Sequence, residues 1–263
     1  MATVVHMAFT RPVPDSLAHC ELTHLARTPI DVANARRQHA EYERMLRELG
    51  CDVRQLPALH EHPDSVFIED TALVFDECAV ITRPGAESRR GETQGIAEAL
   101  ADYRRLYHID APGTLDGGDV LRVGKRVYVG ESTRSNEDGA RQLADALAPH
   151  GYSVKRAPMR DCLHLKTAVS TLPNGVLLLD PRYVDAASFD GARCIHVHHD
   201  EPEAANVLVV GKAVVLPASA PRTREMLDAA GYRTVAVDAS ELAKAEGGLT
   251  CCSLIVDPGT AQR

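Results

Sequence analysis

The stretch SVFIEDTALVFDECAVITRPG, residues 65–85, decides the fold because its two short apolar runs are separated by the polar pair Asp76 and Glu77. Such a pattern is typical of a β-hairpin. A segment with helical periodicity, ETQGIAEALADYRR (92–105), and a third apolar run, LYHIDAP (106–112), follow it. We therefore predict a unit of two hairpin strands, a helix and a third strand.

The same order of elements recurs along the chain. Further units span residues 114–158, 162–200, where the helix is poor, and 205–240, with hairpin turns at GK, PNG and GK. A strand at 2–9, a helix at 31–50 and a strand at 52–58 would form a fifth unit, completed by the final strand at Cys251. The helix at 31–50 should bury one face, made of Ala33, Ala35, Tyr42, Met45 and Leu46. Repeats of about 45 to 60 residues predict units arranged around an axis.

Composition indicates an ordinary globular protein of one domain, residues 1–263. The chain is 44% hydrophobic and 25% charged, with a net charge of -8 and no long basic cluster. This charge argues against nucleic acid and anionic membranes as partners. Because no apolar run approaches the roughly 18 residues of a membrane helix and no secretory signal is evident, we expect a cytoplasmic protein. The seven cysteines, without C-x-x-C spacing, predict free thiols.

Polar residues stand at similar points of successive units, inside apolar surroundings. Glu69 and Asp70 are adjacent in a predicted strand, so their side chains should point to opposite faces. In TLDGGDVL, Asp116 and Asp119 flank two glycines that would let another group approach closely. A radial arrangement would bring these carboxylates to one axis, together with His164 of CLHLKT and the cysteine doublet of EGGLTCCSL.

Each of these residues also has an ordinary structural interpretation. The carboxylates could bond backbone amides in turns, His164 could be a satisfied core residue, and both cysteines could pack as small apolar groups. His196 and His198 would share a strand face and could bind zinc, although solvated edge histidines are the simpler interpretation. For the doublet, strand geometry would send Cys251 to the axis and Cys252 to the packing face beside Leu254 and Val256.

The motifs SVFIEDTALV, ITRPGAESRR, TLDGGDVL, STRSN, CLHLKT and EGGLTCCSL stand in this order along nearly the whole chain. In order and spacing the chain resembles the dimethylarginine dimethylaminohydrolases (dimethylargininases) of the guanidine-modifying, or pentein, superfamily. The resemblance implies an α/β fold, a five-bladed propeller of ββαβ units with pseudo-fivefold symmetry around a central active site. It also implies hydrolysis of Nω,Nω-dimethyl-L-arginine and Nω-methyl-L-arginine to L-citrulline and dimethylamine or methylamine, with neither metal nor organic cofactor.

Site residues follow from the resemblance position by position. Related enzymes read Cys-x-Ser at the nucleophile, which places it on Cys251, with His164 as general acid and base and Asp116 as the third catalytic residue. The substrate-binding positions fall on Leu22, Asp64, Glu69, Asp70, Arg89, Arg134 and Ala245. Leu22 and Ala245 would act through backbone carbonyls. The expected partner is a small methylated arginine, bound by a monomer or homodimer.

These residue types suit the reaction. Carboxylates such as Asp70 and Asp116 bond guanidinium N–H groups strongly and orient the central carbon. Asp64 matches the ammonium of the amino-acid head, and Arg89 and Arg134 match its carboxylate through bidentate pairing. Because a thiol is mostly protonated at neutral pH, Cys251 needs a cationic neighbour, which the substrate itself could supply.

Three alternatives stay open at this point. Arginine deiminases and amidinotransferases share the nucleophile, histidine and acids, although they are typically longer. A non-catalytic arginine-binding protein could use the same scaffold. A zinc hydrolase built on His196 and His198 is the third.

Overall fold

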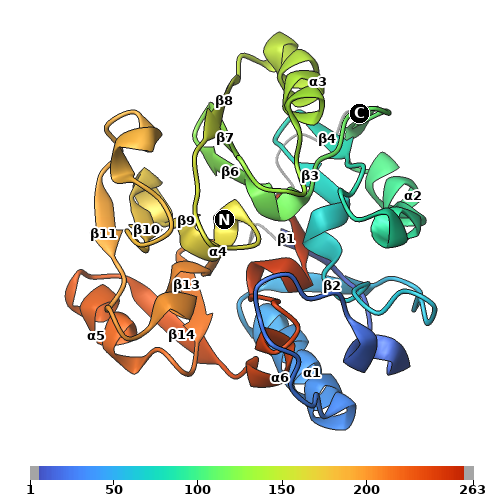
Figure 1. The fold of residues 1–263 in the computed structure, drawn as a ribbon. Coiled ribbons are helices and arrows are strands. Elements are labelled where there is room, and N and C mark those ends of the chain that lie inside the picture. Colours follow the sequence, from blue (N-terminus) through green and yellow to red (C-terminus); the bar gives the residue numbers. More distant parts are fainter. Residues whose placement is uncertain (1–5, 258–263) are drawn as a thin grey trace.

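The computed structural model describes residues 6–257, and this part of the chain folds into five small sheets of three strands each. Figure 1 shows the five units placed around a central axis in chain order. The strands are β1 (His6–Thr10), β2 (Cys51–Gln55), β3 (Ala72–Val74), β4 (Cys78–Ile81), β5 (Arg105–His108), β6 (Val120–Val123), β7 (Arg126–Gly130), β8 (Ser153–Ala157), β9 (Val169–Thr171), β10 (Leu177–Leu179), β11 (Cys194–His196), β12 (Leu208–Val210), β13 (Ala213–Pro217), β14 (Arg233–Val237) and β15 (Leu254–Val256).

Every sheet has the same topology. The middle strand pairs antiparallel with one neighbour and parallel with the other, as β4 does with β3 and β5. The fifth sheet has the order β15-β1-β2, so the last strand closes the ring onto the first. The predicted five-bladed propeller and its closure are therefore confirmed, although residues 2–5 of the predicted first strand lie outside the described residues.

Helices cover the outside of the ring (Figure 1). They are α1 (Val32–Glu48), α2 (Ile96–Ala101), α3 (Glu137–Leu147) and α5 (Pro221–Ala229). Of the two short helices, α4 (Leu165–Ala168) lies near the axis and α6 (Ser240–Ala243) lies beside α1 (Figure 1). The third unit, which had the poorest helical sequence, has only a 3₁₀ turn at Ala186–Phe189 before β11. No helix within residues 6–257 combines the length and the apolar character that crossing a membrane requires.

The helix α1 shows why its sequence folds as it does. Asp31 caps its first turn by accepting a hydrogen bond from the backbone N–H of Asn34. The buried face consists of Ala35, Gln38, His39, Tyr42, Glu43, Met45 and Leu46. The prediction for Ala33 was wrong, because this residue is exposed. Polar residues take its place on the buried face, where Glu43 accepts a hydrogen bond from Thr10.

A short helical turn precedes the inner strand of every blade. These turns are Ile68–Thr71 before β3, Gly117–Asp119 before β6, α4 before β9, Pro202–Ala205 before β12 and Thr250–Cys252 before β15. Because the strands are arranged around one axis, the turns bring their side chains to one end of it. This common position is where the candidate site lies.

Candidate active site

The polar motifs lie in these turns and not in strands, which corrects two local predictions. Glu69 and Asp70 are both buried in the turn Ile68–Thr71, where Thr71 Oγ1 donates to the carbonyl of Ile68. Cys251 and Cys252 are both buried in the turn Thr250–Cys252, so the strand alternation predicted for them is wrong. The convergence of the motifs on one axis is nevertheless as predicted.

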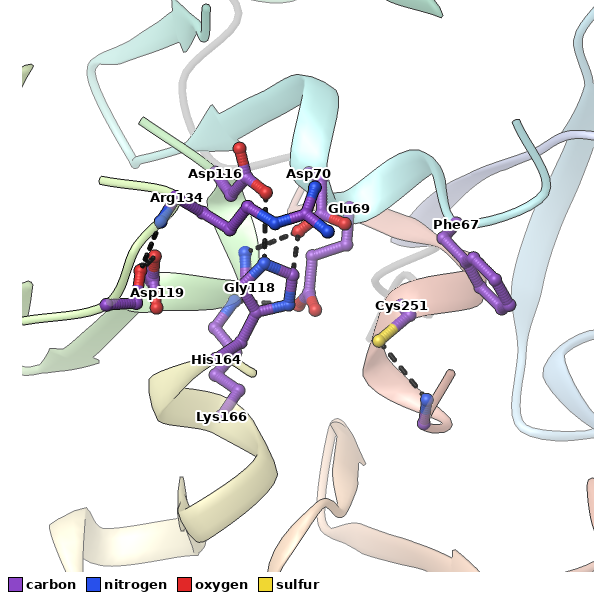
Figure 2. A network of polar contacts seen from close by, with 12 residues as sticks. Phe67, Glu69, Asp70, Asp116, Gly118, Asp119, Arg134, His164, Lys166 and Cys251 are labelled. Carbon is purple, nitrogen blue, oxygen red and sulfur yellow. Dashed lines mark hydrogen bonds and ion pairs between the residues drawn. The ribbon is translucent and has the colours of Figure 1, made fainter. Parts of the chain in front are cut away.

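His164 lies at the centre of the cluster, immediately before α4 (Figure 2). Its Nε2 atom is 3.0 Å from Oδ2 of Asp116, and its Nδ1 atom is 3.9 Å from Oδ1 of Asp70. Burial favours the neutral ring, but the carboxylates of Asp70, Asp116 and Asp119 outweigh this effect and raise the pKa of His164 to about 9. The imidazole is therefore a cation at neutral pH and can donate a proton.

The two carboxylates beside His164 are held by backbone N–H groups. Asp70 accepts from the N–H of Gly118 at 2.9 Å, and Asp116 accepts from the N–H of Gly85 at 2.8 Å. Burial raises the pKa of Asp70, but His164 and Arg89 outweigh it and lower that pKa to about 2. Asp70 can therefore place negative charge beside a bound cation.

The glycine pair Gly117–Gly118 permits the close approach that its sequence predicted. A Cβ atom on Gly118 would lie 2.8 Å from Asp70 Oδ1 and 2.8 Å from His164 Nδ1. A Cβ on Gly117 would lie 2.0 Å from the carbonyl oxygen of Glu69. Any side chain at these positions would push the three blades apart at the site.

Arg89 is buried and its donors are largely used within the protein. Its Nη1 donates to Asp70 at 2.7 Å, and its Nε and Nη2 donate to the carboxylate of Glu92. Nη2 also donates to the carbonyl of Phe67. Since a guanidinium has five N–H donors, little capacity remains for the bidentate substrate contact predicted from the motif.

Cys251 faces the same cavity as His164 (Figure 2). Its sulfur accepts a hydrogen bond from the N–H of Gly248 at 3.3 Å, which favours the thiolate. Burial and the negative charges of Glu69 and Asp70 are stronger, and they raise the pKa of Cys251 to about 12. In the empty site this thiol is therefore protonated.

Glu69 lies behind the cavity. One carboxylate oxygen accepts from Lys166 Nζ at 2.7 Å and the other from Thr250 Oγ1 at 2.6 Å. Thr250 and Lys166 are joined in turn by Asn206, whose side-chain amide bonds both. These three partners were missed in the sequence, although Lys166 and Thr250 lie within the quoted motifs.

The cavity is small in this structure, with a volume of about 20 Å³, enough for about one water molecule. Of the predicted residues it is lined by Asp64, Asp70, Arg89, Arg134, His164, Ala245 and Cys251. Asp116 and Glu69 lie behind this lining, and Leu22 adjoins Glu21, which does line it.

The segment at 21–25 begins at the cavity, which Glu21 lines. The carboxylate of Glu246 accepts from the N–H groups of Thr23, His24 and Leu25 and holds the segment in place. Arg134 reaches it from the other side, with Nη2 donating to Thr23 Oγ1 at 3.2 Å.

The alternative zinc-binding pair is not formed as predicted. The strand β11 ends at His196, so His196 and His198 do not share a strand face. His198 instead groups with His199 and Asp200. All seven cysteines are free, as predicted.

Comparisons with known proteins agree with this architecture. Residues 25–168 match a family model described as "N,N dimethylarginine dimethylhydrolase, eukaryotic". The chain is 42% identical over 226 residues to an N(G),N(G)-dimethylarginine dimethylaminohydrolase from Pseudomonas aeruginosa, covering 85% of this chain and 89% of the relative. It is 40% identical over 255 residues to the enzyme of that name from Streptomyces coelicolor, covering 93% and 94%.

Solved structures extend the similarity to three dimensions. A cysteine-to-serine mutant of the Pseudomonas aeruginosa enzyme, complexed with citrulline, matches with a TM-score of 0.91 and 40% identity over 96% of this chain and 100% of that chain. The N-terminal domain of a cyanobacterial arginine dihydrolase shares the fold, with a TM-score of 0.81 at 21% identity over 96% and 98%. The chain therefore belongs to the dimethylarginine dimethylaminohydrolase family of the pentein superfamily.

Proposed function

We propose that this protein hydrolyses Nω,Nω-dimethyl-L-arginine and Nω-methyl-L-arginine to L-citrulline and the corresponding methylamine. The observation that carries the proposal is the placement of Cys251 and His164 on one buried cavity, with Asp70 and Asp116 on either side of the imidazole. This arrangement supplies a nucleophile, an acid and anionic support for a guanidinium. The named relatives provide the substrate class.

Substrate binding activates the nucleophile. The raised pKa of Cys251 results from burial beside two carboxylates, so a guanidinium placed between them and the sulfur offsets its cause. The thiol then releases its proton to water, and the thiolate forms next to its electrophile. Before substrate binds, the protonated Cys251 thiol thus stays unreactive toward other electrophiles.

The reaction proceeds in two halves. Cys251 Sγ attacks the guanidinium carbon, and protonated His164 gives its proton to the substituted nitrogen, which leaves as the amine. The C–N bond breaks and a positively charged S-alkyl thiouronium remains. Neutral His164 then accepts a proton from water as its oxygen attacks the same carbon. Collapse of this adduct breaks the C–S bond and passes the hydroxyl proton to the departing sulfur, which releases citrulline and restores the Cys251 thiol.

The amino-acid head binds through opposite charges. Asp64 lines the cavity and matches the ammonium, with Ala245 and Leu22 contributing backbone carbonyls. Arg134 has fewer competing partners than Arg89 and supplies the main contact to the carboxylate. Arg89 acts mainly through Asp70, which it fixes in the orientation that the guanidinium requires.

A citrulline assay on asymmetric dimethylarginine, monomethylarginine, arginine and agmatine tests the proposal. Turnover should be highest with the methylated arginines and low with agmatine, which lacks the carboxylate. The variants Cys251→Ser and Cys252→Ser form a matched pair, and only the first should abolish turnover. Faster ammonia release from arginine would identify a deiminase instead, and binding without citrulline formation would identify a non-catalytic binding protein.

We further propose a cytoplasmic enzyme that acts on its small-molecule substrate as a monomer or homodimer. Cell fractionation and sedimentation at the working protein concentration test the two parts. An assembly larger than a dimer would contradict the second.

A further inference from the structure

Asp119 is a completely buried carboxylate that takes no part in the proposed reaction. It ends the turn Gly117–Asp119, three residues after Asp116. Its Oδ1 accepts from the backbone N–H of Leu165 at 3.1 Å. Its Oδ2 accepts from Ser135 Oγ at 2.6 Å and from Ser132 Oγ. A buried charge with this many donors is a strong local organiser.

Each of the three donors leads to a different residue of the site. Leu165 directly follows His164 and begins α4. Ser135 Oγ accepts from the backbone N–H of Asp116 at 3.1 Å. Ser132 Oγ accepts from the backbone N–H of Arg134 at 3.0 Å. One or two hydrogen bonds thus connect the Asp119 carboxylate to the backbone next to His164, of Asp116 and of Arg134.

The donor and acceptor roles in these hydrogen bonds depend on the carboxylate. A serine hydroxyl has one proton, and both serines use their oxygen to accept a backbone N–H. Their protons must therefore go to Asp119, which accepts both on the same oxygen. An amide nitrogen at that place would donate and oppose both hydroxyls.

We infer that Asp119 is a positioning residue that fixes His164, Asp116 and Arg134 relative to one another through Leu165, Ser135 and Ser132. The inference rests on the proposed function for its kinetic consequences. The geometry that it predicts for the His164–Asp116 pair can be tested whether or not the protein turns over substrate. The two serine branches lead to different steps, one to proton transfer and one to substrate binding.

Kinetics of single variants separate the branches. Ser135→Ala should lower kcat with little change in KM, because it releases Asp116 from its place beside His164. Ser132→Ala should raise KM with little change in kcat, because it releases the segment of Arg134. Asp119→Asn should do both and lower kcat/KM by on the order of 100-fold, the effect of misplacing reacting groups by about 1 Å.

Glu201→Gln is the matched control. Glu201 is also a buried carboxylate, and it accepts from the backbone N–H groups of Arg222 and Thr223 at the start of α5. This variant should lose stability without changing kcat or KM. If Asp119→Asn behaves in the same way, the positioning role is refuted.

An NMR titration of His164 provides a readout that does not need turnover. Ser135→Ala replaces no ionisable group, so a lowered pKa of His164 in this variant reports weaker support from Asp116 and Asp119, the two carboxylates whose residues Ser135 Oγ bonds. An unchanged pKa overturns the inference, whether or not the protein hydrolyses methylarginine. Absence of citrulline from the unsubstituted protein refutes the proposed function, and the titration still decides the role of Asp119.

Discussion

Two histidine–aspartate clusters in this molecule use the same residue types with opposite surroundings. The axial cluster is Asp70, Asp116 and His164, and the surface cluster is His198, His199 and Asp200. In each cluster, potential ligand atoms of all three residues lie within 4.8 Å of one another. The axial residues are buried, whereas the side chains of His199 and Asp200 are 81% and 58% exposed.

The difference shows that backbone support, and not residue type, makes the axial cluster a site. Its carboxylates are fixed by the N–H groups of Gly118 and Gly85, in surroundings where charges interact strongly. Asp200 of the surface cluster instead pairs with the exposed Arg222 at 2.8 Å, where solvent screens the interaction. Substitutions in the two clusters should therefore differ in size.

The largest difference is expected for the histidines. His164→Gln should lower kcat for asymmetric dimethylarginine by roughly 1,000-fold, within the range that general acid–base catalysis contributes. His199→Gln, the control in the surface cluster, should leave kcat unchanged. Initial-rate measurements of citrulline formation check this, and near-normal turnover by His164→Gln would remove His164 from the mechanism.

The aspartates should differ next, in stability. Asp70→Asn leaves Arg89 without one of its buried partners, and such a loss costs about 3 kcal/mol of unfolding free energy. Asp200→Asn breaks an exposed pair and should cost less than about 1 kcal/mol. Denaturant unfolding of both variants measures the contrast. Equal effects would mean that the axial pair is no stronger than a surface one.

The pH dependence sharpens the same contrast through His164. Since its pKa in the folded protein is about 9, His164 should stay protonated through neutral pH. The value of kcat, which reports the complex in which Cys251 is already ionised, should fall about tenfold per pH unit once His164 loses its proton. For stability the sign follows from a folded pKa above the unfolded value of about 6.5. The contribution of His164 is complete below the unfolded value and is lost as pH rises through about 9.

Paired pH series test both statements. The unfolding free energy of the unsubstituted protein should fall relative to that of His164→Gln as pH rises from about 6.5 to about 9. A kcat profile that already declines near pH 7 would contradict the raised pKa. If His164 causes both effects, the fall in stability should be complete near the pH at which kcat begins to fall.

The smallest effect is expected from metal removal. Protonated His164 and Arg89 already place two cations beside Asp70, which disfavours a divalent ion there. Strong chelation should leave citrulline formation unchanged. A loss of activity that zinc restores would revive the metal hypothesis and shift attention to the surface cluster.

The fold could be predicted from the sequence because its signals are local. Hairpin turns such as Asp76–Glu77 and Gly124–Lys125 separate runs that become paired strands in four of the five units, and the repeat then predicts the ring. The spacing of apolar residues predicts the helix at 31–50. Its exposed Ala33 shows that periodicity gives a face only approximately, since tertiary packing decides its edges.

The local structure of the site could not be predicted because its determinants are distant in sequence. A short apolar run such as 66–74 does not distinguish a strand from a turn followed by a strand. Asp70 is fixed by Arg89 and Gly118, which lie in other elements. The sequence places Asp119 beside the glycine pair, but its partners Ser132 and Leu165 become its neighbours only in the folded ring.

The proposed mechanism depends most directly on which sulfur forms the covalent intermediate. Turnover of asymmetric dimethylarginine is quenched with acid, and the digested protein is sequenced by tandem mass spectrometry. We predict a thiouronium adduct on Cys251, with Cys252 unmodified. An adduct on Cys252, or citrulline formation with no trapped adduct on Cys251, would contradict the assignment.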